Sequence, residues 1–238
     1  MEDLKVFEEV LDRPTLLTLY RLLNKGFLTE LHGVVNSGKE ALVFAGRRGE
    51  QEVAVKIYRV TALRFRNIYP YIVGDQRFMG LRRSRRALIY AWTLKEYKNL
   101  KRMYKAGVRV PRPIAVLNNV LVMEFIGRDG APAPLLKDQP PEKPEETFKL
   151  LANYVELMYR RARLVHADLS EYNVMMWNGE PVIIDVAQAV LTSHPMAMQF
   201  LRRDVENLVR FFGRLGVKTP KPEELIRQIT KPTNGEQT

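Results

Sequence analysis

The sequence predicts an α+β fold of two lobes, with a five-stranded antiparallel sheet and one long helix in the first lobe and a reduced, mainly helical second lobe. Three observations predict it. Short β-rich runs fill residues 31–58 and recur at 114–125, and a long helical pattern separates them at 84–105. After residue 127 the composition turns to prolines and charges, and then to further helical patterns.

The sheet is predicted from five short runs of apolar, often β-branched residues. Three of them, at 31–36, 41–45 and 52–58, follow one another closely, with a polar turn at 47–51 before the third. The other two form a hairpin within 114–125, because two asparagines separate them. Connections this short join antiparallel neighbours.

Helices are predicted where apolar residues recur at helical spacing. The first begins near Pro14, which suits a helix start, and ends before Gly26, which suits a helix end. The long helix at 84–105 is followed by Gly107. Its expected apolar face contains Ala87, Tyr90, Leu94, Tyr97 and Leu100.

The second lobe is predicted to contain a helix near 145–162, short strands at 173–177 and 181–185, and a final amphipathic helix at 195–215. An Asn-Gly pair at 178–179 indicates a hairpin between the two strands. The apolar face of the last helix is expected to contain Met198, Leu201, Val205, Leu208 and Phe212.

These patterns divide the chain into four parts. We expect an N-terminal helical extension at 1–30 and a first lobe at 31–126, which carries an insertion near 60–83. A second lobe follows at 127–230, and a frayed tail at 231–238.

Charge and cysteine content limit the function classes. The net charge of +11 favours polyanionic partners, although a thermophile's charged surface or a generally basic proteome would give the same value. The absence of cysteine excludes disulfides and thiolate metal sites, and a cytoplasmic location is expected. No uncharged apolar stretch of about 18 residues occurs, so we expect neither a membrane span nor a membrane partner.

The strongest chemical signal lies in HADLSEYN, residues 166–173, and in IID, residues 183–185. Phosphoryl transfer needs a carboxylate that orients the attacking oxygen and oxygen ligands that hold Mg²⁺. Asp168 suits the first task, and Asn173 and Asp185 suit the second. Because a hairpin returns the chain to its start, Asn173 and Asp185 are expected to meet. The alternative is a polar surface loop.

A second signal is Lys56, which ends the run VAVK on the third predicted strand. Kinases place a lysine here on the ATP phosphates and pair it with a glutamate from the next helix. The long helix supplies Glu96 for this pair. The alternative is that both side chains are exposed to solvent.

A third signal is the loop Ser37, Gly38, Lys39 and Glu40 between the first two predicted strands. Backbone N–H groups of such a loop can cradle phosphate. Glu40 stands where a Walker A loop has Ser or Thr, and a strand follows where a helix should begin, so we predict a flap between strands. A plain hairpin turn is the alternative.

The run MEFIG, residues 123–127, ends the fifth predicted strand before the change in composition. The backbone of Glu124 to Ile126 suits binding of an adenine edge, and Met123 suits contact with its face. The alternative is an ordinary connector with a core methionine.

The segment between Arg59 and Arg86 interleaves arginines with aromatic residues. Such a mixture suits RNA backbone contact and base stacking. A solvated basic face is the alternative. The residues are Arg64, Arg66, Arg77, Arg82, Arg83 and Arg85, with Phe65, Tyr69, Tyr71 and Phe78.

Together these motifs resemble the RIO family of atypical kinases, closest to its type-1 branch, over roughly residues 30–215. The pieces are NSGKEALVF, VAVKIYRV, YIVGDQRF, KEYKNL, MEFIG, LVHADLSEYN, VIIDVAQAV and HPMAMQFLRRD. The resemblance implies a bilobal protein-kinase-like fold and a self-phosphorylating serine/threonine protein kinase or ATPase that uses ATP with Mg²⁺ or Mn²⁺. It also implies a role in late maturation of the small ribosomal subunit, with the precursor particle or its rRNA as partner.

Site roles follow from the resemblance residue by residue. It implies that residues 37–40 form the phosphate loop, that 123–126 form the hinge and that 60–83 are the family's flexible insertion. It implies a catalytic Asp168, a phosphate-binding Lys56 with its partner Glu96, and the metal ligands Asn173 and Asp185.

Several departures from ordinary protein kinases bear on the substrate. Ala167 stands where they carry an arginine. The chain reaches its last predicted helix about ten residues after Asp185, which leaves no room for an activation segment or peptide-docking helices. Ala187 and Ala189 replace an expected Ser or Gly of the RIO pattern, so no hydroxyl is supplied there. A peptide would therefore be poorly held by this part of the chain.

Two alternative functions stay open. One is an ATP-gated or non-enzymatic RNA-binding assembly factor. The other is a small-molecule phosphotransferase, which would need a larger second lobe.

Overall fold

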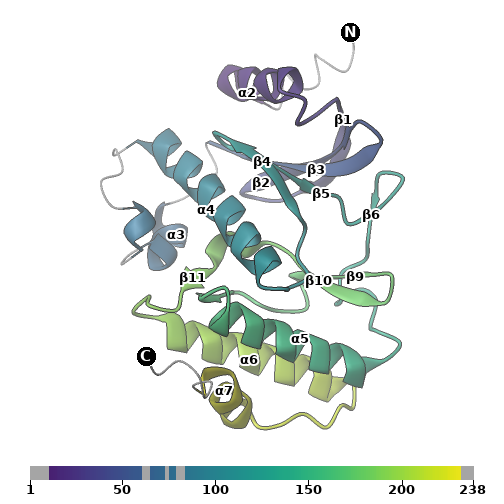
Figure 1. Cartoon of the computed structure of the whole chain (residues 1–238), viewed down its shortest axis with the longest axis vertical. Coiled ribbons are helices and arrows are strands. Elements are labelled where there is room, and N and C mark those ends of the chain that lie inside the picture. The colour runs from purple at the N-terminus through teal and green to yellow at the C-terminus, as the bar shows by residue number, and fades with distance from the viewer. Residues whose placement is uncertain (1–10, 61–64, 73–74, 79–83, 232–238) are drawn as a thin grey trace. The chain divides into compact units, whose positions relative to one another are not determined.

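The computed structural model describes residues 11–60, 65–72, 75–78 and 84–231 (Figure 1). The chain forms two compact units. The first consists of residues 1–98 and 111–132, and the second of residues 99–110 and 133–238. Insertion residues 61–64, 73–74 and 79–83, which include Arg64, Arg82 and Arg83, and tail residues 232–238 lie outside the described residues. The predicted domain ranges stay predictions.

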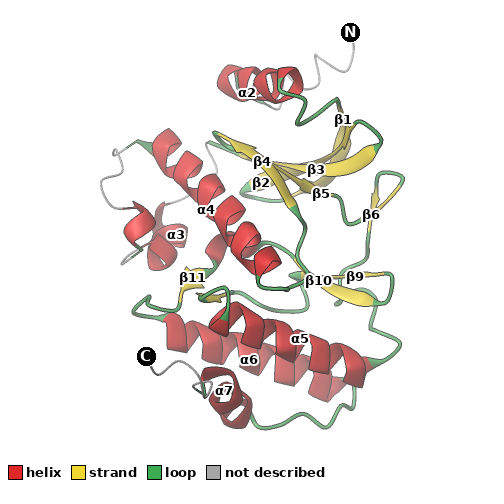
Figure 2. Ribbon diagram, viewed as in Figure 1, coloured by secondary structure: helices red, strands yellow, loops and turns green. Residues whose placement is uncertain are grey.

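The first unit is built on a five-stranded sheet with the order β1-β2-β3-β5-β4, in which all neighbours are antiparallel (Figure 2). This confirms the predicted sheet. Pro113 lies in an edge strand, where its missing N–H removes no hydrogen bond from the centre of the sheet. The strands are β1 (Glu30–Ser37), β2 (Ala41–Arg48), β3 (Gln51–Tyr58), β4 (Pro113–Leu117) and β5 (Val120–Glu124).

Both faces of β3 are buried, and they differ in kind. Val53, Val55 and Ile57 belong to an apolar cluster that also contains Leu19 and Leu22 of α2 (Arg13–Asn24). The alternate residues of the strand, which include Lys56, share the opposite face. The strand therefore carries an apolar core on one side and a charged group on the other.

The predicted insertion contains helices that the sequence patterns did not indicate. They are α3 (Phe65–Ile72) and the short 3₁₀ helix η1 (Gln76–Phe78). The rings of Tyr71 and Phe78 lie 6.4 and 6.5 Å from the ring of Trp92 on α4 (Arg85–Lys105). These aromatic contacts attach the described part of the insertion to the long helix.

The long helix α4 forms as predicted, and Leu100 of its expected apolar face is buried, but other predicted positions of that face are not. Leu94 is 40% exposed, whereas Trp92 and Glu96 are buried almost completely. Thr93 and Asn99 are buried as well. A face that buries polar side chains cannot be located from apolar spacing alone.

The second unit is mainly helical, and its described residues also form two short antiparallel strand pairs, β9 with β10 and β8 with β11. Asn178 and Gly179 have φ of 52° and 81°, as a tight two-residue hairpin turn requires. Leu135 adds a bridge to Met175. The elements are α5 (Pro144–Arg160), β8 (Leu164–Val165), β9 (Val174–Trp177), β10 (Glu180–Ile183), η2 (Val186–Gln188), β11 (Val190–Leu191), α6 (Ala197–Arg214) and α7 (Pro222–Thr230).

Two details of the predicted last helix were wrong. Met198 is 49% exposed and does not join the buried face of α6. The helix α7 follows it, with Pro222 in its first turn and Leu225, Ile226 and Ile229 buried. Between the sheet and α5, Gly127–Arg128 (β6) pairs with Ala131–Pro132 (β7) within the first unit. None of the described helices is long and apolar enough to cross a membrane.

Candidate active site

Lys56 and Glu96 form a buried ion pair in the first unit. The Nζ atom of Lys56 donates to Oε1 of Glu96 at 2.7 Å, and the hydroxyl of Tyr58 donates to Oε2 at 2.6 Å. The side chains of Lys56 and Glu96 are 10% and 2% exposed. Strand β3 therefore offers two donors on one face, and they hold both oxygens of a single carboxylate from α4.

Burial makes this pair costly to break. Removing one member of a buried ion pair leaves an uncompensated charge, at a cost of about 3–5 kcal/mol. A buried pair adds little net stability compared with apolar packing. Its presence in the core of the sheet is therefore better explained by a chemical task for the lysine than by stability.

An apolar cluster occupies the same side of the sheet as Lys56. It contains Ala45, Ala54 and Phe125, with Val43 and Met123 packed against it. Ala54 pairs in register with Met123, two residues along β3 from Lys56. An aromatic base bound here would contact an apolar surface beside Lys56. Met123 is part of this surface, and it was predicted to contact the face of the adenine.

The predicted phosphate loop connects β1 and β2 directly, as a strand–loop–strand flap requires. The N–H of Gly38 donates to the carbonyl of Ala41 at 3.0 Å, and the guanidinium of Arg59 donates to Oγ of Ser37 at 3.2 Å. Lys39 is exposed and Glu40 is half-buried. These residues form a short, closed turn that presents Lys39 to solvent.

The predicted hinge residues leave the sheet at the end of β5. Glu124 is tied to Arg112, whose N–H donates to Oε2 of Glu124 at 3.0 Å. Phe125 and Ile126 are buried. At Gly127, φ is +153° and a Cβ would lie 2.1 Å from the carbonyl oxygen of Ala131, so the chain can turn here with glycine alone.

In the second unit, Asp168 and Asn173 are joined by hydrogen bonds. Nδ2 of Asn173 donates to the backbone oxygen of Asp168 at 2.7 Å and lies 3.3 Å from its Oδ2. Burial raises the pKa of Asp168, and the charge of Asp185 raises it further, while Arg203 and Asn173 lower it. The resulting carboxyl is half-buried and is a better proton acceptor than an ordinary aspartate.

Asp185 follows β10 and lies next to Asn173 in the hairpin. The N–H of Ile184 donates to the carbonyl of Asn173 at 3.0 Å, so the two ends of the hairpin meet as predicted. Asp185 has φ of +56°, in the left-handed region, and is exposed. A non-glycine residue in this region is uncommon, and such residues cluster at functional sites.

Asp204 of α6 holds the backbone on both sides of Asp168. Its Oδ2 accepts from the N–H of Ala167 at 2.8 Å, and its Oδ1 accepts from the N–H of Leu169 at 2.9 Å. The guanidinium of Arg203 donates to the carbonyl of Ala167. Ala167 has φ of +68°, so these contacts fix a strained backbone immediately before the candidate catalytic residue.

His166 supports the loop and is unsuited to act as a base. It is buried, and this burial lowers its pKa to about 4. The ring is therefore neutral at pH 7, and its Nε2, 3.2 Å from the carbonyl of Ile184, must be the protonated nitrogen that donates to it. The contact connects the loop before Asp168 to the strand end before Asp185.

Asn173 and Asp185 suit a magnesium ion. Because Nδ2 of Asn173 donates to Asp168, Oδ1 of the same amide would be the atom that binds the metal. Mg²⁺ is held by one or two protein oxygens together with substrate phosphates and water. Among the described residues no cluster of three or more His, Asp or Glu has the arrangement of an all-protein metal cage.

Comparisons with known proteins identify the family. The model of the RIO domain matches residues 42–225, which is more than half of the chain. The RIO-type serine/threonine-protein kinase Rio1 of Methanocaldococcus jannaschii is 46% identical over 230 residues, covering 97% of this chain and 79% of that protein. The chain belongs to the RIO family. Its enzyme class is RIO-type serine/threonine-protein kinase, as the motifs predicted.

Other relatives agree with this assignment. The Rio1 kinase of Haloferax volcanii is 43% identical, covering 90% of this chain and 74% of that protein. The human kinase RIO1 is 39% identical, and this chain spans 42% of its length. A crystal structure of the Rio2 kinase from Chaetomium thermophilum matches with a TM-score of 0.67 and 21% identity, covering 90% of this chain and 67% of that chain. This last similarity confirms the protein-kinase-like α+β fold.

Most of the predicted site residues lie next to the neighbours that were expected from the sequence. The sequence patterns did not indicate the residues that hold them in place. Tyr58, Arg203 and Asp204 were not singled out, although YR and RRD lay within the quoted motifs. A carboxylate on the apolar face of α6, beside Phe200 and Leu201, was a signal for Asp204. A buried charge among apolar residues needs partners, and here they are backbone N–H groups.

Proposed function

We propose that this RIO kinase binds ATP with Mg²⁺, or Mn²⁺ in its place, and transfers the γ-phosphoryl group to serine or threonine hydroxyls, its own among them. The observation that carries this proposal is the buried Lys56–Glu96 ion pair, whose 2.7 Å contact lies in the buried part of β3. A lysine held in this way is the group that protein kinases direct at the nucleotide phosphates. A second crystal structure of the Chaetomium thermophilum Rio2 kinase is an ADP/Mg²⁺-phosphoaspartate complex. Its match covers 91% of this chain and 66% of that chain.

In the first unit, the ammonium of Lys56 binds phosphate oxygens while Glu96 and Tyr58 fix its position. The loop from Ser37 to Glu40 covers the phosphates with backbone N–H groups other than that of Gly38, which is bonded to Ala41. The apolar cluster around Met123 receives the adenine, and the backbone of Glu124 to Ile126 binds the adenine edge.

In the second unit, Asp168 orients the acceptor hydroxyl and accepts its proton, a task that its raised pKa favours. Asn173 and Asp185 hold the metal through Oδ1 and a carboxylate oxygen. A bound divalent cation neutralises the charge that develops on the phosphate oxygens. Asp204 and Arg203 keep the Asp168 backbone in place during this step.

A second candidate activity is ATP hydrolysis through Asp185. Its carboxylate is exposed, whereas Asp168 is half-buried, so Asp185 is the more accessible nucleophile. Attack of a carboxylate oxygen on the γ-phosphorus would break the bond to ADP and form an acyl phosphate. Water would then release inorganic phosphate and restore the carboxylate. The phosphoaspartate of the Rio2 complex supports this route.

We also propose that the enzyme acts in the cytoplasm on precursors of the small ribosomal subunit, through the particle or its rRNA. The net charge of +11 and the arginines between Arg59 and Arg86 support a polyanionic partner. The family's ribosomal role, implied by the motifs, supports the choice of this partner.

ATP turnover with Mg²⁺ tests the proposal. Wild type, Asp168→Ala and Asp185→Ala are compared with and without small-subunit particles, and nucleotide binding is measured in parallel. We expect both variants to bind ATP and to lose turnover, and we expect particles to raise wild-type turnover. If all three proteins bound the particles equally and none turned over ATP, an RNA-binding assembly factor would replace the kinase.

A further inference from the structure

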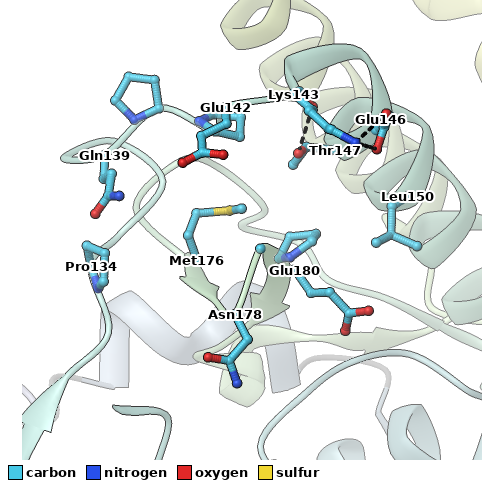
Figure 3. A pocket seen from close by; sticks show the side chains of 14 residues that line it. Pro134, Gln139, Glu142, Lys143, Glu146, Thr147, Leu150, Met176, Asn178 and Glu180 are labelled. Carbon is cyan, nitrogen blue, oxygen red and sulfur yellow. Dashed lines mark hydrogen bonds and ion pairs between the residues drawn. The ribbon is translucent and has the colours of Figure 1, made fainter. Parts of the chain in front are cut away.

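The second unit has a groove of about 630 Å³, whose lining side chains Figure 3 shows. One side is formed by the segment from Pro134 to the start of α5, and the other by the hairpin β9–β10. Asp168, Asn173 and Asp185 are absent from its lining, as far as the described residues extend. The volume falls within the range of about 300–1,000 Å³ that is usual for ligand sites.

The lining of this groove is acidic in a strongly basic chain. Glu142 comes from the proline-rich segment, Glu146 from the first turn of α5 and Glu180 from the start of β10. Among the described lining residues the only cation is Lys143, which is paired with Glu146 at 3.1 Å. Three carboxylates against one ammonium leave a net negative groove where the chain as a whole carries +11. RNA phosphates would be repelled here.

Apolar groups lie between the carboxylates. Figure 3 shows Met176 in the middle of the lining and Leu150 to one side of it. Both side chains are half-buried, and Pro134 and Pro181 add rigid apolar rings. Lysine and arginine match such a surface, because their aliphatic stems lie along apolar groups while their charged ends reach acids.

We propose that this groove docks an extended basic segment of a partner protein, in which Lys or Arg alternates with apolar residues. An extended chain places alternate side chains on one face, so its basic residues can reach carboxylates supplied by three separate elements. This inference rests on the proposed function in one respect, since the partner is taken to be the protein that receives the phosphoryl group. Only the residues 186–196 lie between Asp185 and α6, so this connection offers little surface to a protein acceptor.

The hairpin connects the groove to the candidate metal ligands. Strand β9 begins directly after Asn173, and β10 ends two residues before Asp185. Each strand has four residues, which corresponds to about 13 Å from the turn to the ligand end. A docked segment would therefore lie about four extended residues from the end of the hairpin that bears Asn173 and Asp185.

Binding is measured by fluorescence anisotropy without nucleotide, so that the result does not depend on kinase activity. The probe is a short fluorescein-labelled peptide in which Lys and Arg alternate with Leu, and its counterpart carries Gln in place of Lys and Arg. The groove variant combines Glu142→Gln, Glu146→Gln and Glu180→Gln. The matched control combines Glu50→Gln, Glu145→Gln and Glu206→Gln, which change the net charge equally at positions outside the groove lining.

We expect the basic peptide to bind wild type and the control with equal affinity and to bind the groove variant about tenfold more weakly. The Gln peptide should not bind, and added salt should weaken the basic complex. Equal losses in both variants would show a response to net charge alone and would overturn the proposal, as would undiminished binding to the groove variant. Displacement of the peptide by spermine at equal affinity would also overturn it, because the site would then accept any polycation. Thermal unfolding of each variant confirms that it is folded.

A kinetic readout links the groove to catalysis. For a protein acceptor that bears the basic segment, the groove variant should raise KM about tenfold and leave kcat and self-phosphorylation unchanged. If wild type bound the basic peptide but did not phosphorylate itself, the proposed function would fail and the groove proposal would stand. If wild type phosphorylated itself but did not bind the peptide, the groove proposal alone would fail.

Discussion

Replacing Asp204 by asparagine tests how the candidate catalytic loop is held. The substitution keeps the size of the side chain and exchanges one acceptor oxygen for an NH₂ group that faces a backbone N–H. One of the two hydrogen bonds, of 2.8 Å to Ala167 and 2.9 Å to Leu169, is thereby lost. A buried N–H left without an acceptor costs about 1–3 kcal/mol. The free energy of unfolding should fall by this amount.

The same change should lower catalysis more than nucleotide binding. Both hydrogen bonds flank Asp168, and a displacement of about 1 Å at a catalytic group can lower the rate about 100-fold. We expect kcat to fall about 10- to 100-fold and the KM for ATP to stay within about twofold. Urea unfolding and steady-state kinetics measure the two effects. Glu206→Gln, on the same helix, is the control.

Two results would refute this reasoning. If Asp204→Asn lost stability but kept the wild-type kcat, the contacts would stabilise the fold without positioning Asp168. If the free energy of unfolding did not change, the backbone N–H groups would have found other acceptors, and the account of the loop would be wrong.

Three further predictions concern other parts of the two units. Because the pKa of His166 is depressed to about 4, its contribution to stability should be complete above pH 6.5 and lost as the pH falls toward 4, by about 3 kcal/mol in all. The substitution His166→Phe should flatten this part of the curve of stability against pH. An unchanged curve would contradict burial of a neutral ring. Tyr58→Phe removes a donor to the Glu96 carboxylate and should cost about 1.5–3 kcal/mol in urea unfolding, a value that a change below about 0.5 kcal/mol would exclude. Gly127→Ala should destabilise the first unit by more than about 2 kcal/mol, whereas Gly130→Ala, with open space around its Cβ, should cost about 1 kcal/mol. Equal melting temperatures for the two variants would argue against the close approach of residue 127 to Ala131.

The sequence predicted which candidate residues would lie together where they are close in the chain. Asp168 and Asn173 lie on one loop, and an Asn-Gly turn brings Asp185 back to them, so spacing and turn chemistry were sufficient. Lys56 and Glu96 were predicted from a strand followed by a helix. Leu94 was wrongly placed on the buried helix face, because part of that face is buried through polar contacts, which apolar periodicity does not register.

Other features depend on long-range partners and were missed. Asp204 contacts backbone more than 30 residues away, at Ala167 and Leu169, and no local pattern indicates this. The helix α7 did have local signals, with Pro222 in its first turn and acidic residues after it, but the predicted helices of the second lobe ended at residue 215. The groove depends on the hairpin meeting the proline-rich segment, through contacts such as Leu135 with Met175.

Single-turnover transfer from γ-labelled ATP tests the central claim most directly. Wild type, Asp168→Asn and Asp185→Asn are mixed with labelled ATP and Mg²⁺, and nucleotide binding is measured by calorimetry on the same samples. The account predicts that all three proteins bind ATP and that wild type alone forms labelled phosphoserine or phosphothreonine on itself. Transfer by Asp168→Asn at the wild-type rate would contradict the role of Asp168 and, with it, the proposed mechanism.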